Sequence, residues 1–237
     1  MALAPKLALR NLFQDPLRLI ATVVGIGFSM VLVTVQIGLY VSFQKMVTVM
    51  IDHADADLWI VPRGSKSFED PSWLDEHERF RALSINGVLG AVPLVVGLGR
   101  WRAPSGATSP IFIVGADRRE DGLQPWNLVD GNIESLSIPG AVAIDQSYFD
   151  RLETRRIGES AEINDQTVKV LEITHGIRSF TTMPYVFVSP DLARTLTGTP
   201  PNKASYFIVH LTPGANAAET REELRARLVD DDVLTPD

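Results

Sequence analysis

The chain has 237 residues, of which 45% are hydrophobic and 22% are charged, and its formal net charge is −7. The first eighteen residues hold three basic side chains and one acidic one, a balance of +2, so the remainder carries about −9. An acidic chain is not expected to bind nucleic acid, and a chain without cysteine must fold on a hydrophobic core and not on disulfides.

Residues 1–18 form a basic leader. Its segment 5–18 alternates basic and apolar positions, which is typical of an amphipathic helix that lies in a membrane interface. Pro16 is expected to bend the chain where the leader meets the next segment. A merely solvated basic leader is the alternative.

Residues 19–44 contain no charged side chain. As a helix, this run is about 39 Å long, which exceeds the ~30 Å hydrocarbon core of a bilayer. A secretory signal is the competing interpretation, because Ala54-Asp55-Ala56 matches a cleavage pattern, but the apolar core of a signal has only ~7–15 residues. We therefore predict a retained transmembrane helix.

The charges around this helix predict its orientation. Basic residues precede it, and Asp52, Asp55 and Asp57 follow it. Because basic flanks stay in the cytoplasm, the N-terminus is predicted to be cytoplasmic, with residues 45–237 on the periplasmic side of the inner (plasma) membrane.

Small and polar side chains occupy two sides of the predicted span. At ~100° per residue, one group projects within about 60°, and a second group lies opposite. Small residues let helices approach, amides and hydroxyls bond across the contact, and a polar group in lipid is costly without a partner. We predict packing against other membrane helices; the alternative is that such residues are simply common in spans. The first group is Thr22, Gly25, Ser29, Gln36 and Tyr40, and the second is Gly27, Thr34 and Gly38.

A helical stalk, residues 45–54, is expected after the span. An apolar stripe leads into it and continues along it, formed by Phe43, Met46, Val47 and Met50.

Residues 55–237 alternate strand and helix patterns and predict an α+β domain. A strand at 57–62 is followed by a helix at 73–83 with Asp70 or Ser72 as its cap, and by a hairpin from 88–103 and 109–117.

The middle of this domain is rich in glycine, proline and asparagine. It is expected to contain loops, a short helix at 143–153 and a hairpin that turns at Asn164-Asp165.

The last part predicts a strand at 185–189, a helix that begins at Ser189-Pro190, and a strand, a helix and a strand at 204–211, 216–229 and 232–236.

Strand-helix-strand units thus open and close the domain. We predict one α/β subdomain from residues 55–124 and 186–237, with a β-rich insert at 125–185.

No residue pattern predicts catalysis, a metal or a cofactor. His53, His77, His175 and His210 have no ligand spacing, and no Gly-x-Ser-x-Gly elbow is present. The segment around Lys66 lacks the spacing of a phosphate-binding loop.

Three motifs resemble the ABC-transporter permeases of the FtsX/MacB superfamily, and the DevC-type subunits in particular. They are Ala8-Leu9-Arg10-Asn11 in the leader, Gln36-Ile37-Gly38 late in the span, and Ala56-Asp57-Leu58 at the first strand. The resemblance implies a MacB-type periplasmic domain with a porter-like α/β part and an inserted β part. It further implies a dimer, a separate ABC ATPase subunit, a membrane-fusion adaptor and export driven by ATP.

The resemblance predicts that this chain is the N-terminal half of such a permease, because relatives continue into three more spans after the periplasmic domain. A truncated chain, an interrupted gene and a short natural subunit stay open. The alternative function is a single-span, membrane-anchored periplasmic binding or sensor module, which would have an apolar pocket the size of a ligand. A single-span membrane enzyme is a third, less supported reading.

Overall fold

The computed structural model describes residues 15–65, 67–117, 122–132, 134–179 and 181–236. The motif at Ala8–Asn11 and most of the leader lie outside the described residues. The chain divides into two compact units, residues 1–45 and residues 46–237, which we describe separately.

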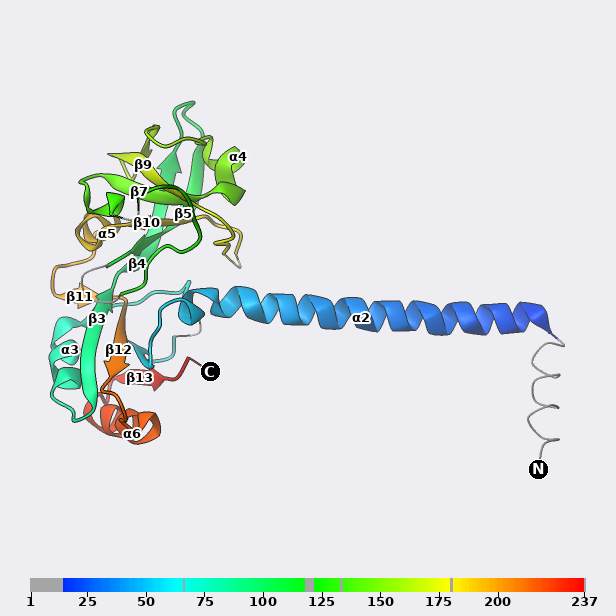
Figure 1. Cartoon of the computed structure of the whole chain (residues 1–237), viewed down its shortest axis with the longest axis horizontal. Coiled ribbons are helices and arrows are strands. Elements are labelled where there is room, and N and C mark those ends of the chain that lie inside the picture. The colour runs from blue at the N-terminus through cyan, green and yellow to red at the C-terminus, as the bar shows by residue number, and fades with distance from the viewer. Residues whose placement is uncertain (1–14, 66, 118–121, 133, 180, 237) are drawn as a thin grey trace. The chain divides into compact units, whose positions relative to one another are not determined.

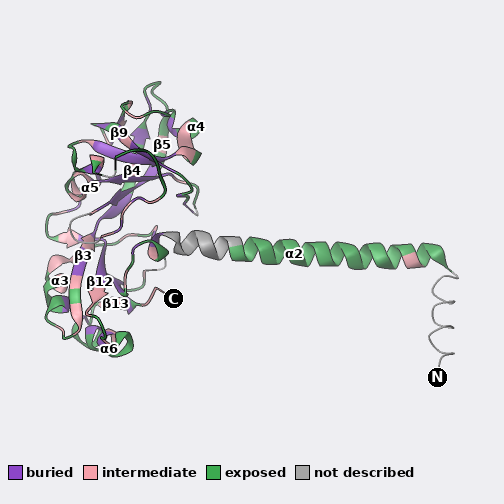
Figure 2. Cartoon of the chain, in the orientation of Figure 1, coloured by how far each residue is buried: buried purple, intermediate pink, exposed green. Residues whose placement is uncertain are grey.

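Helix α2, Pro16–Asp52, contains the whole predicted span (Figure 1). Pro16 stands at its first position, where the missing N–H removes no helical hydrogen bond, and the Asp15 carboxylate accepts from the Arg18 N–H at 3.3 Å. Within the described residues, Pro16–Val41 is the one stretch long and apolar enough to cross a membrane, with a mean hydropathy of 2.1. Figure 2 colours this stretch as exposed, apart from Leu19 near its start, which is of intermediate burial.

A four-stranded antiparallel sheet joins the two ends of the second unit. Its order is β13-β1-β12-β3, so the first and last strands of the domain are hydrogen-bonded neighbours. This confirms that segments distant in sequence share one sheet. The strands are β1 (Leu58–Pro62), β3 (Val88–Leu94), β12 (Tyr206–Leu211) and β13 (Asp231–Leu234).

Two helices cover one face of this sheet. Helix α6, Ala217–Arg227, is capped by Asn216, and helix α3, Glu76–Leu83, is capped by Asp75. The predicted caps Asp70 and Ser72 were wrong, because Leu74-Asp75 forms the short strand β2, which pairs with β11, Lys203–Ala204. The Asp75 carboxylate then accepts from the His77 N–H at 3.0 Å, and the helix begins there.

A seven-stranded mixed sheet forms the rest of the domain, in the order β6-β9-β7-β10-β5-β4-β8. A further pairing between β8 and β9 closes six of these strands into a ring, so the described part is a small barrel with β6 outside it. The strands are β4 (Val96–Arg102), β5 (Thr108–Gly115), β6 (Leu128–Gly131), β7 (Ala141–Asp145), β8 (Ser160–Ile163), β9 (Gln166–Thr174) and β10 (Tyr185–Val188).

Both predicted hairpins are confirmed. Strands β4 and β5 pair antiparallel, as do β8 and β9. The second turn places Asn164 and Asp165 at φ +48° and +65°, the left-handed pair that a tight two-residue hairpin requires.

Two short helices and two 3-10 turns complete the domain. Helix α5, Pro190–Thr197, begins as predicted with Ser189 as its cap. The helix predicted at 143–153 is much shorter, because Ala143–Asp145 belongs to β7 and the left-handed Glu153 ends α4, Phe149–Leu152. The 3-10 turns are Ser135–Ser137 and Gln146–Tyr148.

The chain changes sheets between β3 and β4 and again between β10 and β12. Strands β4, β5 and β10 therefore belong to the barrel, although the sequence analysis assigned the whole β4–β5 hairpin and all of β10 after Tyr185 to the α/β part. The predicted α/β subdomain of residues 55–124 and 186–237, with its insert at 125–185, stays a prediction. In the structure, the chain passes from the four-stranded sheet to the seven-stranded sheet near residue 95 and returns near residue 205.

Each sheet has apolar side chains on both of its faces, and these side chains form three apolar clusters. Ile111, Ile113 and Val186 point into the barrel, whereas Phe112, Val114 and Phe187 point out of it. The outward set meets Trp59, Leu94 and Ile208 of the four-stranded sheet in what we call the shared core. The opposite face of that sheet packs Ile60, Phe207 and Val209 against Ala82 of α3 and Leu224 of α6.

An unfavourable charge lies where β13 meets α3. Burial, together with Glu78, Asp230 and Asp232, raises the pKa of Asp231 to about 6, from 3.8. The folded protein therefore binds more protons than the unfolded chain between these two pH values, so the free energy of unfolding contributed by Asp231 falls as the pH rises through this window.

Replacing Asp231 with Asn should stabilise the protein at pH 7 and flatten its pH profile between about pH 4 and pH 7. After solvent screening, we expect a gain on the order of 1 kcal/mol at pH 7. Thermal unfolding of the full chain in detergent, followed by tryptophan fluorescence, measures the effect. The control Glu222→Gln removes an exposed carboxylate from α6 and should change little; an equal gain in that variant contradicts the assignment.

Candidate functional site

The two predicted faces of the span are both exposed along α2. Three hydroxyls of these faces bond to their own helix: those of Thr22, Ser29 and Thr34 donate to the carbonyl one turn earlier, at 2.9, 2.9 and 2.8 Å. These hydroxyls do not need a neighbouring helix, which differs from the interhelical bonds that the sequence suggested. Gly25, Gly27 and Gly38 have open space beside the Cα.

Gln36 differs from these hydroxyls. Its side-chain amide has no hydrogen-bond partner within the described part of the chain, whereas each of the three hydroxyls has one. A shallow groove passes along the same helix and is lined by Gly25, Ser29, Val33 and Thr34. A close neighbour at this groove and a partner for Gln36 stay predictions.

The predicted stalk stripe meets the domain at its last member. The side chains of Phe43, Met46 and Val47 lie outside the described residues, although α2 continues through them. Met50 is only 1% exposed, and Ala54 is 2% exposed. Met50 therefore does not stand on a free stalk but is packed inside the domain that spans residues 46–237.

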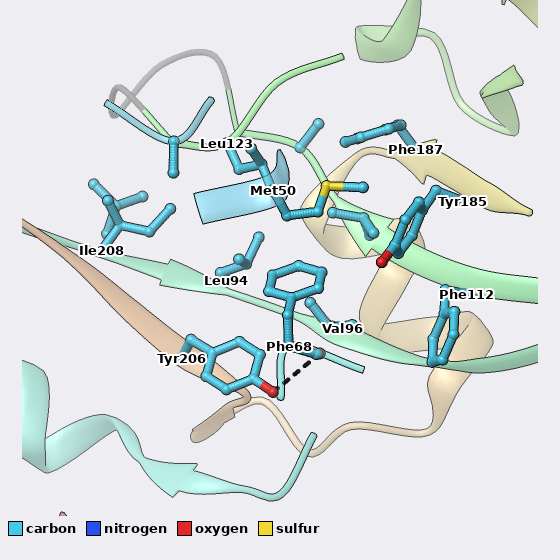
Figure 3. Packing of buried hydrophobic residues seen from close by; sticks show 14 of the residues in the cluster. Met50, Phe68, Leu94, Val96, Phe112, Leu123, Tyr185, Phe187, Tyr206 and Ile208 are labelled. Carbon is cyan, nitrogen blue, oxygen red and sulfur yellow. Dashed lines mark hydrogen bonds between the residues drawn. The ribbon is translucent and has the colours of Figure 1, made fainter. Parts of the chain in front are cut away.

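Met50 occupies the shared core, where both sheets contribute side chains. Figure 3 shows it among Leu123, Phe68 and Tyr185, with Leu94 and Ile208 of the four-stranded sheet in the same cluster. The flexible thioether suits an irregular gap between two sheets. The end of α2 thus touches both parts of the domain at once.

Glu69 fixes a second connection between the two sheets. Its carboxylate oxygen Oε1 accepts from the Ser179 hydroxyl and from the Tyr185 hydroxyl, each at 2.6 Å. Glu69 follows β1 of the smaller sheet, while Tyr185 begins β10 of the barrel. Burial and the Glu69 carboxylate raise the pKa of Tyr185, so the phenol stays a donor.

The Ala56-Asp57-Leu58 motif has a structural role at the start of β1. The Asp57 carboxylate accepts from the Leu211 N–H at 2.7 Å, and the Asp57 N–H donates to Val209 at 3.0 Å. Leu58 is fully buried, and Ala56 packs against the shared core. The motif therefore holds β1 and β12 together immediately after the helix end.

The histidines and one buried carboxylate occupy other places in the described part of the domain. Within the described residues, no group of three or more histidines or carboxylates is placed to hold a metal ion. His53 and His210 line one pocket together, which their distance in the sequence did not indicate, and His53 stacks on Trp126 at 3.9 Å. Asp145 is buried and accepts from the N–H groups of Ser147 and Ile177, each at 2.8 Å, so this carboxylate holds the backbone.

An apolar pocket beside the shared core bears on the alternative of a binding module. It measures about 150 Å³ and is lined by Trp59, Phe68 and Tyr206. Pockets that bind small-molecule ligands commonly measure ≈ 300–1,000 Å³. This pocket is therefore smaller than a periplasmic binding module would require.

Comparison with known proteins identifies the domain. The family described as MacB-like periplasmic core domain matches residues 19–227. The extracellular domain of the noncanonic ABC-type transporter YknZ from Gram-positive bacteria has a TM-score of 0.54 at 17% identity, and the match covers 76% of this chain and 99% of that one.

The periplasmic region of MacB from Actinobacillus actinomycetemcomitans also has a TM-score of 0.54, at 12% identity, over 81% of this chain and 94% of the other. No curated protein matches the sequence. These matches confirm the predicted fold class and the resemblance to the FtsX/MacB superfamily, but not the DevC subtype.

Replacing Gln36 with Leu should leave membrane insertion intact and weaken association between membrane helices. The variant removes the amide and, with it, an interhelical hydrogen bond worth roughly 1 kcal/mol in a membrane, so crosslinking should fall several-fold. Cysteines introduced at Gly25 or Val33, in a chain that has none of its own, report the contact. The matched control Val35→Leu changes no polar group; equal crosslinking in the Gln36→Leu and Val35→Leu chains contradicts the prediction.

Proposed function

We propose that this chain, which belongs to the family of MacB-like periplasmic core domains, acts as the permease subunit of an ATP-driven exporter. In this proposal it is the N-terminal, first-span half of such a permease, of the DevC-like kind. In the same proposal, the energy comes from a separate ABC ATPase subunit.

The arrangement across the membrane follows from the charges of the flanks. Lys6, Arg10 and Arg18 precede the apolar run, and this charge bias supports a cytoplasmic N-terminus, next to the proposed ATPase. Residues 45–237 then face the periplasm, where a membrane-fusion adaptor would dock. Family resemblance supports both partners and a homodimer.

One observation carries the proposal: Met50, at the end of α2, is buried in the core that both sheets share. A tilt or rotation of the helix moves a side chain that contacts the barrel and the four-stranded sheet together. Packed interiors transmit such displacements because they have little free volume. The helix end is therefore suited to transmit force from the membrane to the periplasmic domain.

The polar features of the span support dependence on partners. An unpaired amide at Gln36 and open space beside Gly25, Gly27 and Gly38 suit a helix with close neighbours in the membrane. A helix that served only as an anchor would need neither feature.

Orientation can be tested in intact cells, since the chain has no native cysteine. A membrane-impermeant maleimide added from outside the inner membrane should modify Leu89→Cys, whose parent side chain is 65% exposed, and should not modify Ala2→Cys. The opposite labelling pattern would overturn the assignment, and labelling of both sites after the membrane is opened is the control.

Coupling can be tested at Met50. Spin labels at Leu89→Cys in two copies should change their separation when an ATP analogue is added to the chain with its ATPase partner. Met50→Ala should reduce this change, at a cost of about 2–5 kcal/mol in stability.

Leu196→Ala is the matched control, because Leu196 is also buried but lies in the barrel cluster, away from the helix end. It should destabilise the domain to a similar degree and keep the change in separation. An equal loss in both variants would mean that stability, and not coupling, explains the result.

A further inference from the structure

A tight turn joins α3 to β3 (Figure 1). The Val88 N–H donates to the Ile85 carbonyl at 3.3 Å across this turn, so Asn86 and Gly87 occupy its two central positions. Gly87 has φ +95°, a backbone conformation that glycine adopts without steric cost. Asn86 is exposed, and it is the one asparagine of the sequence that a glycine follows.

The peptide unit between these two residues is not engaged by the rest of the domain. In the described part of the chain, neither the Asn86 carbonyl nor the Gly87 N–H has a hydrogen-bond partner, and the Asn86 side-chain amide has none either. The exposed amide is therefore free to rotate toward the Gly87 nitrogen. Since residue 87 has no Cβ, no side chain hinders that approach.

We propose that Asn86 is a site of spontaneous covalent modification, at which its side-chain amide is lost through attack by the Gly87 nitrogen. The nitrogen bonds to Cγ of Asn86 and gives up its proton, and the amide group leaves with a proton as ammonia. A five-membered imide results, which water then opens. Because the attacking nitrogen belongs to the next residue, the reaction is intramolecular and needs no enzyme.

The imide gives two products, because water can break either of the bonds that join its carbonyl carbons to the Gly87 nitrogen. Breaking the bond to Cγ gives aspartate with the original main chain. Breaking the bond to the main-chain carbonyl carbon of residue 86 gives isoaspartate, in which the main chain passes through the former side chain and gains one methylene. Both products carry a new negative charge at this position.

The turn has little space for a longer main chain. The Gly87 carbonyl accepts from the Thr212 N–H at 2.8 Å. A Cβ at residue 87 would lie 3.1 Å from Thr220 Oγ1 of α6 and 3.3 Å from the Cβ of Ala215, which precedes that helix. The extra methylene of isoaspartate shifts this glycine, so we expect the modified chain to unfold at a lower temperature.

Two other asparagines provide matched comparisons within the same chain. Asn164 also lies in a tight turn, but its Oδ1 accepts from the Arg100 N–H at 2.9 Å and its Nδ2 donates to a carbonyl of α5 at 2.8 Å. Asn202 is exposed like Asn86 but is followed by Lys203, whose side chain hinders the attack. Both should therefore lose their amides more slowly than Asn86.

Ageing of the full chain in detergent, at mildly alkaline pH and body temperature, tests the proposal. Peptide mass spectrometry measures the loss of each amide, and labelling with isoaspartyl methyltransferase detects the isoaspartate product. We expect Asn86 to convert at least several-fold faster than Asn164 and Asn202, and the unfolding temperature to fall as conversion proceeds. The reaction does not depend on the proposed exporter function, so no ATPase is needed.

The variant Asn86→Gln is the matched control. It keeps the amide but adds a methylene, so the same attack would have to close a larger, six-membered ring. Its amide should be lost far more slowly, and its unfolding temperature should stay constant during ageing. A fresh sample that unfolds like the fresh unaltered chain shows that the variant is folded.

Several results would overturn the proposal. Equal rates at Asn86 and Asn202 would remove the role of Gly87. Loss of the amide in Asn86→Gln at the rate of the unaltered chain would assign the reaction to another nucleophile. Conversion of Asn86 in urea but not in the folded chain would show that the folded turn protects it.

Discussion

The periplasmic domain depends on the burial of both faces of three barrel strands. On β5, β7 and β10, alternate side chains point into the barrel and out of it, and both sets are apolar. A barrel with an apolar outer face is not stable in water alone. The four-stranded sheet covers this face, and Met50 fills part of the space between them. The helix end is thus a component of the core and not an attachment to it.

Because one end of α2 is packed in the shared core, the polar residues farther along this helix bear on what else it contacts. Hydroxyls of Thr22, Ser29 and Thr34 are satisfied within α2, so only Gln36 among these polar residues calls for an outside partner. In the proposed function, α2 has neighbours in the bilayer and is packed into the shared core at its other end, so that it would carry displacement between them.

The chain has 29 acidic side chains, and several of those in its described part hold backbone or hydroxyl groups in place. Asp57 joins β1 to β12, Glu69 joins the two sheets, and Asp145 holds a turn; each accepts hydrogen bonds that hold backbone or hydroxyl groups in place. Asp231 is the exception, because burial and the neighbouring Glu78, Asp230 and Asp232 carboxylates raise its pKa. Asp57, Glu69 and Asp145 therefore serve the fold, whereas Asp231 opposes it.

The sequence by itself determined the local features. An uncharged run of 26 residues indicates a membrane helix, the Asn164-Asp165 pair indicates a hairpin, and Ser189-Pro190 indicates a helix start, since each follows from short-range physics. Motifs at Gln36–Gly38 and Ala56–Leu58 indicated the family.

Only the tertiary structure decided the rest. Strand partners are set by long-range pairing, so the placement of β4, β5 and β10 in the barrel was missed, as was the cap at Asp75, which needs β11 beside it. The pairing of Glu69 with Tyr185, the pocket at Trp59 and the burial of Met50 each join segments far apart in sequence. Apolar periodicity indicates that a residue is buried. It does not indicate which residue it packs against, because the hydrophobic effect is non-directional.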